Sequence, residues 1–539
     1  MSIPQKMKIC VVGGGTAGLV TALILQRRLE AQVDVLVPKN IPIIGVGEGS
    51  TEHWHDFISY IGKTEIDSVL QTKGTIKTGI HFKDWMTTGD YIHSVSGDFT
   101  TKMGLTSLPY AKMMAEGLSP KQLVPEELWS NKLGDWLGPD GKRQVMGGFV
   151  QYHFNTFELN NWLTRVCNEK QRDITLHDEE VEQVIVDDNG IKQLKCKTGK
   201  TYEADYYIDC TGFRRLLIGE LGAEWQSYGK YLPLKEAIAF PTEDLDEYPL
   251  QTRAWALDAG WTWQIPTYGR TGNGYIYDTD FINKDQAVEE ITKKYGKEPE
   301  VAKHIKFDPG KLDKVWIKNC IAVGLSANFL EPLEATSIGT SIQQSFMLMH
   351  RLTKKPSQRE IDTYNNLVDE VMVNTRDFVA LHYMSDRKDT PFWQKCSELP
   401  RPDTLLDYID IWKERPLDEM DIEKYCNHYA LFKDDNFNLI GYAHGFLKPE
   451  VMKSYWDNIN KVNKIGFYDV LWERHLKWRA HQTDTIVGYI PHKRYIQELH
   501  RLNGDYLSIK YEDYIPGQVE IWAKRGFTLT YPRYDDNNI

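Results

Sequence analysis

The sequence has few cysteines and no pattern that would put them to chemical use. Its 539 residues include 7 cysteines, an odd number, and no two of them form a C-x-x-C pair. A disulfide framework needs an even set, and a zinc knuckle needs closely spaced thiol ligands. We therefore expect buried, reduced thiols and no metal site.

Long runs of one kind of residue are also missing. The chain has 64 Lys and Arg against 76 Asp and Glu, a formal net charge of -12, and no basic cluster stands out. A surface that binds the phosphate backbone of a nucleic acid needs such a cluster, and a membrane span needs roughly 18 consecutive apolar residues. The first residues show no signal-peptide pattern. We expect a soluble, cytoplasmic protein that binds neither nucleic acid nor membrane.

What the sequence does contain is a globular composition of ample size. Hydrophobic residues make up 41% and charged residues 26% of the 62.4 kDa chain. A chain of this length exceeds the usual limit of one hydrophobic core, so two closely joined domains are expected. We predict an α/β, doubly wound (Rossmann-like) domain with an added antiparallel sheet over residues 1–335. Residues 336–539 are predicted to form a second, mostly helical region.

The first forty residues carry the clearest local pattern. An apolar run at 8–12 is followed by G-G-G-T-A-G at 13–18, a helical segment, and a second strand at 33–37. Gly13 permits a tight turn, Gly15 lets the backbone approach a pyrophosphate, and Gly18 lets the helix pack close to the sheet. In this context the G-x-G-x-x-G pattern predicts dinucleotide binding.

One expected residue of such a site is absent. The second strand ends with Val37 and Pro38, where an acidic residue usually holds the adenosine ribose, and Asp34 lies inside the strand. Either the ribose is held differently or the cofactor binds weakly.

Two further stretches favour FAD over NAD, although each alone is also compatible with a structural turn. The glycine-broken loop at 41–51 has the form of a strap for a bulky isoalloxazine, and Y-I-D-C-T-G-F-R-R at 207–215 places Asp209 and Gly212 at a strand end. The predicted FAD contacts are Gly13, Gly15, Thr16, Ala17, Gly18, Gly45, Val46, Gly47, Glu48, Asp209, Gly212 and Leu325.

The stretch W-T-W-Q-I-P at 261–266 is ambiguous by itself. It puts Trp261 and Trp263 on one face of an extended segment, which ordinary core packing in a hairpin explains as well as a functional role does.

The order of the motifs resembles one known family. G-G-G-T-A-G, G-V-G-E-G-S-T, T-I-K-T-G-I-H-F-K-D-W, D-C-T-G-F-R, W-T-W-Q-I-P and F-L-E-P-L-E-A-T-S-I follow one another as they do in flavin-dependent halogenases of the tryptophan-halogenase type. R-D-F-V-A-L-H-Y and D-T-P-F-W-Q-K-C extend the resemblance, which covers about residues 7–395 and fades in the last 140 or so.

The resemblance implies a two-component enzyme. Reduced FAD, oxygen and halide would give hypohalous acid, which travels through the protein to an organic substrate. Nothing in the chain looks like a nicotinamide domain, so a separate flavin reductase must supply the reduced flavin.

Lys77 and Glu334 match the catalytic lysine and carboxylate of that family. Alternation in T-I-K-T-G-I-H-F predicts one strand with Ile76, Ile80 and Phe82 on the face opposite Lys77. The lysine could polarise hypohalous acid as an ammonium, or react as an amine to give a haloamine. Glu334 could accept the proton released from the aromatic ring, or act only as a charge at a helix start.

The resemblance also assigns a halide site and a barrier. The amides of Thr336 and Ser337 open a predicted helix and would bind halide, although Ala335 and Ser337 depart from the usual family residues. Trp261 and Trp263, with Ile265 and Pro266 fixing the strand end, would keep organic substrate away from the flavin.

The sequence leaves the substrate open. Tyr455, Trp456, Phe467, Trp472 and Trp478 suit aromatic stacking or ordinary packing, and an indole or phenol substrate is favoured over free tryptophan. The alternatives are a flavin-dependent aromatic monooxygenase and a non-catalytic flavin-binding module. The choice among chloride, bromide and iodide, and the formation of a homo-oligomer, are not decided by the sequence.

Overall fold

The computed structural model describes residues 6–41, 45, 47–94, 108–123, 129, 131–137, 143–145, 151–353, 355–462, 469–470, 473 and 486–504. Its first sheet has the strand order β10-β2-β1-β14-β23-β22, in which only β22 runs antiparallel to its neighbour. Strands covered on both faces are apolar throughout, as in the run at 8–12. The strands are β1 (Lys8–Val12), β2 (Gln32–Leu36), β10 (Ile174–His177), β14 (Tyr206–Asp209), β22 (Trp316–Ile317) and β23 (Cys320–Ala322).

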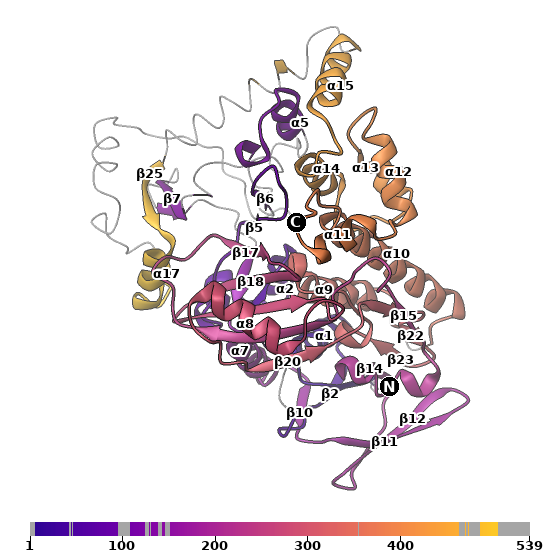
Figure 1. The fold of residues 1–539 in the computed structure, drawn as a ribbon. Coiled ribbons are helices and arrows are strands. Elements are labelled where there is room, and N and C mark those ends of the chain that lie inside the picture. Colours follow the sequence, from indigo (N-terminus) through magenta and orange to yellow (C-terminus); the bar gives the residue numbers. More distant parts are fainter. Residues whose placement is uncertain are drawn as a thin grey trace.

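Helices cover this sheet, as predicted for a doubly wound domain. Helix α1 (Thr16–Leu29) follows the glycine turn and packs against α7 (Thr156–Cys167) and α9 (Thr336–Met349). The first helix of the predicted C-terminal region therefore belongs to the layer that covers the nucleotide-binding sheet (Figure 1). Two short helices, α2 (His53–Tyr60) and α3 (Glu65–Gln71), lie beside it, and α2 contacts α9.

A second, largely antiparallel sheet carries the double-tryptophan strand. Its order is β20-β16-β19-β18-β17-β5-β6, with β17 and β5 parallel, and α8 (Lys284–Tyr295) packs on β16 and β19. Every residue of β18 is buried. The strands are β5 (Gly79–Lys83), β6 (Tyr91–Ser94), β16 (Glu236–Thr242), β17 (Gln251–Ala256), β18 (Gly260–Thr267), β19 (Arg270–Tyr277) and β20 (Lys303–Lys306).

The remaining strands of the described residues form four small sheets. The predicted antiparallel sheet that returns to the nucleotide domain is β11-β12-β13, directly before β14. The others are β3-β9-β4, β15-β21-β24 and β25-β7-β8. Their bounds are β3 (Glu48–Gly49), β4 (Thr75–Ile76), β7 (Lys132–Leu137), β8 (Arg143–Val145), β9 (Tyr152–Phe154), β11 (Val181–Asp187), β12 (Gly190–Cys196), β13 (Thr201–Tyr202), β15 (Trp225–Ser227), β21 (Gly310–Leu312), β24 (Asn328–Phe329) and β25 (Ile486–Pro491).

The chain after α9 is mainly helical, and the α/β fold class with a helical region is confirmed. Helices α10 to α15 gather on one side of the sheets, where α5 (Leu108–Ala115) from the first half packs against α15, whereas α17 lies apart from them beside β25 (Figure 1). None of the helices in the described part of the chain is both long and apolar enough to cross a membrane. The helices are α10 (Gln358–His382), α11 (Pro391–Glu398), α12 (Asp403–Ile411), α13 (Glu419–Glu423), α14 (Asp434–Ala443), α15 (Pro449–Val462) and α17 (His492–Arg501).

The single strand predicted around Lys77 is wrong. The chain leaves β4 at Ile76, crosses between two sheets, and enters β5 at Gly79. The backbone N–H of Lys77 donates to the carbonyl of Gln151, and that of Thr78 donates to the carbonyl of Leu250. Because these acceptors directly precede β9 and β17, which belong to different sheets, Lys77 and Thr78 do not share one ladder. Lys77 thus projects from the junction of two sheets.

Candidate functional site

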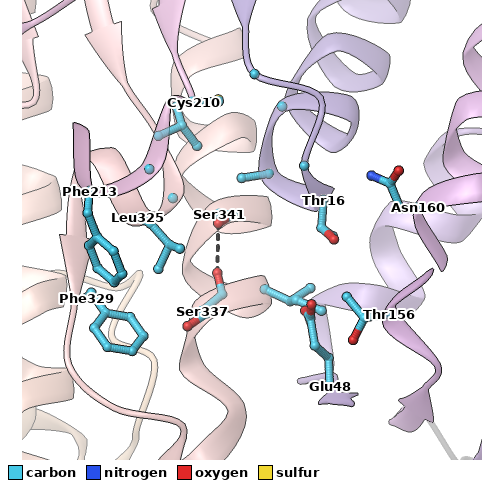
Figure 2. Close-up of a pocket in the computed structure, with 18 of the residues that line it drawn as sticks. Thr16, Glu48, Thr156, Asn160, Cys210, Phe213, Leu325, Phe329, Ser337 and Ser341 are labelled. Atoms are coloured by element: carbon cyan, nitrogen blue, oxygen red, sulfur yellow. Dashed lines mark hydrogen bonds between the residues drawn. The ribbon is translucent and has the colours of Figure 1, made fainter. Parts of the chain in front are cut away.

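A cavity of about 630 Å³ lies at the carboxyl ends of the parallel strands and extends to the double-tryptophan strand. Ligands of doubly wound folds bind at this edge of the sheet. In Figure 2, Thr16, Thr156 and Asn160 lie on one side of the cavity and Phe213 and Phe329 on the other. Of the predicted FAD contacts, the lining includes Gly13, Gly15, Thr16, Ala17, Gly18, Gly47, Glu48, Gly212 and Leu325.

The glycine turn has the shape that a pyrophosphate requires. A β-carbon on Gly13, whose φ is 119°, would lie 2.2 Å from the carbonyl oxygen of Cys210, and one on Gly18 would lie 2.0 Å from the oxygen of Gly13. At Gly15 nothing lies within 4 Å of that position. The first and third glycines therefore allow close packing, and the second faces open space at the start of α1. The observed geometry fits a bound dinucleotide such as FAD.

Helix α7 builds the opposite wall, which the sequence motifs did not indicate. Asn160 donates a hydrogen bond to the carbonyl of Gly14 at 2.7 Å, and the hydroxyl of Thr156 accepts one from the N–H of Gly47 at 3.1 Å. These contacts tie α7 to the glycine turn and to the predicted flavin strap. Burial raises the pKa of Glu48 to about 7, although a hydrogen bond to Thr156 acts to lower this pKa.

The end of the cavity near Val37 does contain acidic residues. Glu179 and Glu180 line it beside Val37 and Lys39. Asp34 does not line the cavity, and its Oδ1 pairs with Nε2 of His177 at 2.7 Å. The carboxylates come from the segment before β11, so the pattern of the first two strands could not reveal them.

Some predicted contacts lie outside the lining. Both oxygens of Asp209 accept hydrogen bonds from the protein, including the backbone N–H groups of Leu217 and Ile218 at 2.8 and 3.0 Å. Asp209 thereby anchors the turn that brings Gly212 to the cavity. Gly45 is also absent from the lining, and Val46 lies outside the described residues, as do Phe467, Trp472 and Trp478.

Trp261 and Trp263 form a buried wall of the cavity, with their ring centroids 6.0 Å apart. The Trp261 indole N–H donates to the hydroxyl of Tyr383 at 3.1 Å, and that hydroxyl donates to Glu331 at 2.7 Å. Burial raises the pKa of Glu331 to about 8, although these hydrogen bonds act to lower it. The indole of Trp261 is therefore held in one orientation.

The end of the double-tryptophan strand is fixed by a proline and its neighbours. Ile265 lines the cavity. Pairing between this strand and β17 ends at Gln264. Pro266 lies two residues beyond that point, so its missing N–H leaves no gap in the ladder with β17. Its carbonyl accepts a hydrogen bond from the hydroxyl of Thr75 at 2.8 Å, which links the strand to the segment that carries Lys77.

Lys77 is completely buried, with its ammonium group among oxygen atoms. Nζ donates to the carbonyl of Ser50 at 2.8 Å and to Oε1 of Gln151 at 3.1 Å. Burial lowers the pKa of Lys77 to about 8, while the carboxylates of Glu334 and Glu52 act in the opposite direction. Near neutral pH the side chain is mainly an ammonium that readily loses its proton.

Glu334 lies in a strained turn between two histidines. It and Ala335 have φ values of 64° and 55°, which non-glycine residues seldom adopt and which cost of order 1–3 kcal/mol each. Its Oε2 is 2.7 Å from Nδ1 of His93, and its Oε1 is 3.1 Å from Nε2 of His382. Burial alone would raise the pKa of Glu334, but the two histidines outweigh it and hold the pKa at about 2.

Gly49 separates the cavity from Lys77. A β-carbon on Gly49 would lie 3.2 Å from Cβ of Ala335 and 3.4 Å from Nζ of Lys77, and both Gly49 and Glu334 line the cavity. The lysine and the Glu334 turn therefore flank the same end of the cavity, although Lys77 itself does not line it.

Helix α9 begins at Thr336, as predicted. The N–H groups of its first turn lack acceptors within the helix, and Ser337 lines the cavity whereas Thr336 does not. Figure 2 shows Ser337 on this helix, with its carbonyl oxygen accepting a hydrogen bond from Ser341 at 2.7 Å.

The residues around Glu334 and Lys77 were missed as functional residues. His382 lies in the R-D-F-V-A-L-H-Y stretch, but a lone histidine in a buried helix carries no signal of its own. His93 and Gln151 belong to short segments without a distinctive pattern. Only the fold brings them to the carboxylate and the lysine. None of the described residues form a group of His, Cys, Asp and Glu side chains able to hold a metal ion.

Comparison with known proteins agrees with this geometry. The model of the tryptophan halogenase family matches residues 8–460. Tryptophan 7-halogenase RebH of Lentzea aerocolonigenes is 30% identical over 433 residues, which cover 75% of this chain and 82% of RebH.

Solved structures extend the likeness to most of the chain. BrvH, a flavin-dependent halogenase from Brevundimonas sp. BAL3, has a TM-score of 0.70 at 26% identity and covers 89% of this chain and 99% of its own. A tryptophan halogenase from Shewanella frigidimarina shares the fold with a TM-score of 0.78 at 24% identity, over 92% of this chain and 98% of its own.

The fold and the site define a flavin-dependent halogenase, a class of enzyme that acts on aromatic substrates with FAD, halide and a separate flavin reductase. Within this class, the chain belongs to the tryptophan halogenase family.

Proposed function

We propose that this enzyme halogenates an electron-rich aromatic ring of the indole, tryptophan or phenol type, with Lys77 delivering the halogen and Glu334 receiving the ring proton. The observation that carries the proposal is that Nζ of Lys77 and Ala335, the neighbour of Glu334, both lie beside Gly49, and that Gly49 and Glu334 line the same cavity. In a site that excludes water, a buried ammonium can polarise the halogen electrophile, and a buried carboxylate can accept a proton.

The residues that would hold FAD come from three parts of the fold. Gly13, Gly15 and the start of α1 receive the pyrophosphate, while Asn160 fixes the glycine turn. Glu180 supplies a carboxylate for the ribose in place of the acid missing at Val37, since it lines the same end of the cavity. The chemistry that reduced FAD supplies, once bound, is the oxidation of halide by oxygen to hypohalous acid.

The tryptophan barrier and the halide site determine which molecules reach the flavin side of the cavity. Trp261 and Trp263 exclude a bulky ring from the flavin side of the cavity, and halide is small enough to enter. The N–H groups of Thr336 and Ser337 at the start of α9 attract an anion, and Ser337 borders the cavity. The choice among chloride, bromide and iodide depends on the turn that contains Ala335.

Lys77 and Glu334 complete the reaction at the organic substrate. Two of the ammonium hydrogens of Lys77 are engaged by Ser50 and Gln151, and the third is left to polarise hypohalous acid. The ring attacks the halogen and acquires a positive charge next to the anionic Glu334. Loss of the ring proton to Glu334 then restores aromaticity.

Substitution of Lys77 tests this proposal. We expect Lys77→Ala to lower halogenation on the order of 10³-fold or more while FAD affinity and peroxide release persist, because Lys77 does not line the flavin cavity. The assay is mass spectrometry of indole, tryptophan and phenol after incubation with FAD, a flavin reductase, NADH and each halide. Free hypohalite serves as the chemical control.

Lys83→Ala is the matched control, since Lys83 lies six residues further along the same segment and lies over Trp255. Halogenation that survives in Lys77→Ala would remove Lys77 from the mechanism. Oxygenated product from the wild type would favour a monooxygenase instead. A cytoplasmic location stays a prediction of the sequence.

A further inference from the structure

A chain of buried side chains leads away from Glu334. Oε1 of Glu334 faces Nε2 of His382 at 3.1 Å, and Nδ1 of His382 is 3.2 Å from the hydroxyl of Tyr91. That hydroxyl is 3.0 Å from Nε2 of His444, whose Nδ1 is 3.3 Å from the carbonyl oxygen of Met384. All three side chains between the carboxylate and the carbonyl are buried.

This series of contacts has one hydrogen too few for every contact to be a hydrogen bond. It has four contacts, Glu334 to His382, His382 to Tyr91, Tyr91 to His444, and His444 to Met384, and each needs one hydrogen. A neutral histidine, a tyrosine and a second neutral histidine supply one each, since both ends of the chain are acceptors only. With every member neutral, one contact must therefore lack a hydrogen.

The geometry locates the gap at Glu334. His444 is aligned with the carbonyl of Met384, so its Nδ1 carries a hydrogen and its Nε2 accepts from Tyr91. Tyr91 must then accept from Nδ1 of His382, which leaves Nε2 of His382 with a lone pair. Consistently, Nε2 of His382 and Oε1 of Glu334 lie 3.1 Å apart but are poorly aligned for an N–H···O hydrogen bond.

The other oxygen of Glu334 is already satisfied. Nε2 of His93 faces the side-chain amide of Asn436 at 3.2 Å, which donates to it and leaves the hydrogen of His93 on Nδ1, toward Oε2 of Glu334. Oε1 is thus the oxygen with free capacity, and it lies on the side of His382.

On the basis of the proposed function, we propose that His382 and Glu334 together form the acceptor for the ring proton, and that Tyr91 and His444 keep His382 in the receptive tautomer. The C–H bond of the halogenated ring carbon breaks, its electron pair restores the aromatic ring, and the proton fills the gap between Oε1 of Glu334 and Nε2 of His382. No other reactant is needed, because the halogen has already been transferred.

The surroundings support a neutral His382 before the reaction. Burial lowers the pKa of His382, against Glu334, which raises it. The rings of Phe82 and Phe378 pack on the imidazole, with centroids 4.5 and 5.1 Å away. The charged or titratable groups that act on the pair are Lys77 and His93 around Glu334, and Tyr91 and His444 beyond His382.

A deuterium isotope effect distinguishes a proton acceptor from a structural residue. In single-turnover halogenation of indole deuterated at its reacting carbon, the wild type should show little isotope effect, because loss of the ring proton is fast. His382→Gln should slow turnover on the order of 10²-fold and make C–H cleavage limiting, so a primary isotope effect appears. A slower His382→Gln without an isotope effect would contradict the inference.

Controls separate this inference from the proposed function. Lys77→Ala should lose product before the proton step, and Tyr364→Phe removes a buried hydroxyl bonded to the carbonyl of Gln344, away from the site, as a matched control that leaves turnover unchanged. If the wild type forms no halogenated product from indole, tryptophan or phenol, the proposed function fails. The next measurement then tests the protonation state of His382 independently of the reaction.

That measurement is nitrogen NMR of protein labelled with ¹⁵N-histidine, in which His382→Gln identifies the resonances of His382. Near neutral pH we expect His382 to be neutral with its hydrogen on Nδ1. Tyr91→Phe removes the acceptor at Nδ1, so the hydrogen should move to Nε2, toward Glu334. A doubly protonated His382 in the wild type, or an unchanged tautomer in Tyr91→Phe, would overturn the inference.

Discussion

At the scale of single residues, the site depends on opposite shifts of two buried charges. Burial pulls the pKa of Lys77 down to about 8, and the histidines beside Glu334 hold its pKa at about 2. The two groups therefore stay oppositely charged near neutral pH without a direct hydrogen bond between them. Glu334 is hydrogen-bonded to His93 and faces His382, so its environment differs from that of an ordinary helix-start charge.

The carboxylate of Glu334 can be tested by an isosteric change. We expect Glu334→Gln to slow halogen transfer on the order of 10²- to 10⁴-fold at unchanged melting temperature, because the amide cannot take up the ring proton. Glu360→Gln, which removes a first-turn charge of α10, is the matched control and should leave turnover as it is. Turnover near that of the wild type in Glu334→Gln would reduce Glu334 to a structural charge.

The pH dependence of halogen transfer reports the reactive form of Lys77. Its pKa is lowered from 10.5 to about 8, so the ammonium prevails below that pH and the amine above it. If the ammonium polarises hypohalous acid, the rate of halogen transfer should fall as the pH rises through about 8. Single-turnover rates, with hypohalous acid formation measured separately, check this. A rate that instead rises through the same range would identify the amine as the reacting group.

At the scale of elements, the double-tryptophan strand depends on the glycines of its partner. Trp263 pairs with Gly274 of β19, and a β-carbon there would lie 2.1 Å from the indole ring. The barrier is therefore a feature of two strands, since β19 provides the space that the indole of β18 fills.

Filling that space should displace the barrier. We expect Gly274→Ala to lower the free energy of unfolding by about 1–3 kcal/mol, the usual cost of overpacking a core. Gly219→Ala is the control, because nothing lies within 4 Å of its added carbon, and it should cost far less. Denaturant unfolding compares the two variants. An equal stability of Gly274→Ala and Gly219→Ala would show that Trp263 moves aside freely.

At the scale of the whole molecule, the flavin cavity joins parts that are distant in sequence. Its walls include the turn at 13–18, residues of α7, and Ser337 of α9, and the double-tryptophan strand closes one end. The helical region reaches Glu334, which lines the cavity, through His382 of α10. Residues of both sheets and of the helix that begins the second half of the chain thus line one cavity.

Cofactor binding should consequently stabilise the whole chain. A ligand that binds only the folded state adds about 2.7 kcal/mol at a concentration 100 times its Kd, so FAD should raise the Tm by a few degrees. We expect Glu180→Gln to require more FAD for the same shift, whereas Glu182→Gln, two residues along and outside the lining, should match the wild type. Thermal shift titrations measure this, and equal titrations of both variants would exclude Glu180 from the ribose site.

The sequence by itself determined the class of fold and the family. The glycine turn between an apolar run and a helix specifies β1 and α1 because local sterics and periodicity act within a few residues. The start of α9 at Thr336 and the buried double-tryptophan strand follow from similarly local patterns. Lys77 and Glu334 were identified by motif order, which reflects ancestry rather than any geometry visible in the sequence.

Only the tertiary structure decided how these residues meet. The break between β4 and β5 at Lys77 arises because its backbone bonds to segments that are distant in sequence. The two histidines beside Glu334 come from β6 and α10, and the carboxylates near Val37 come from the segment before β11. Contacts of this kind depend on how sheets and helices pack over the whole chain, so no pattern within a short window encodes them.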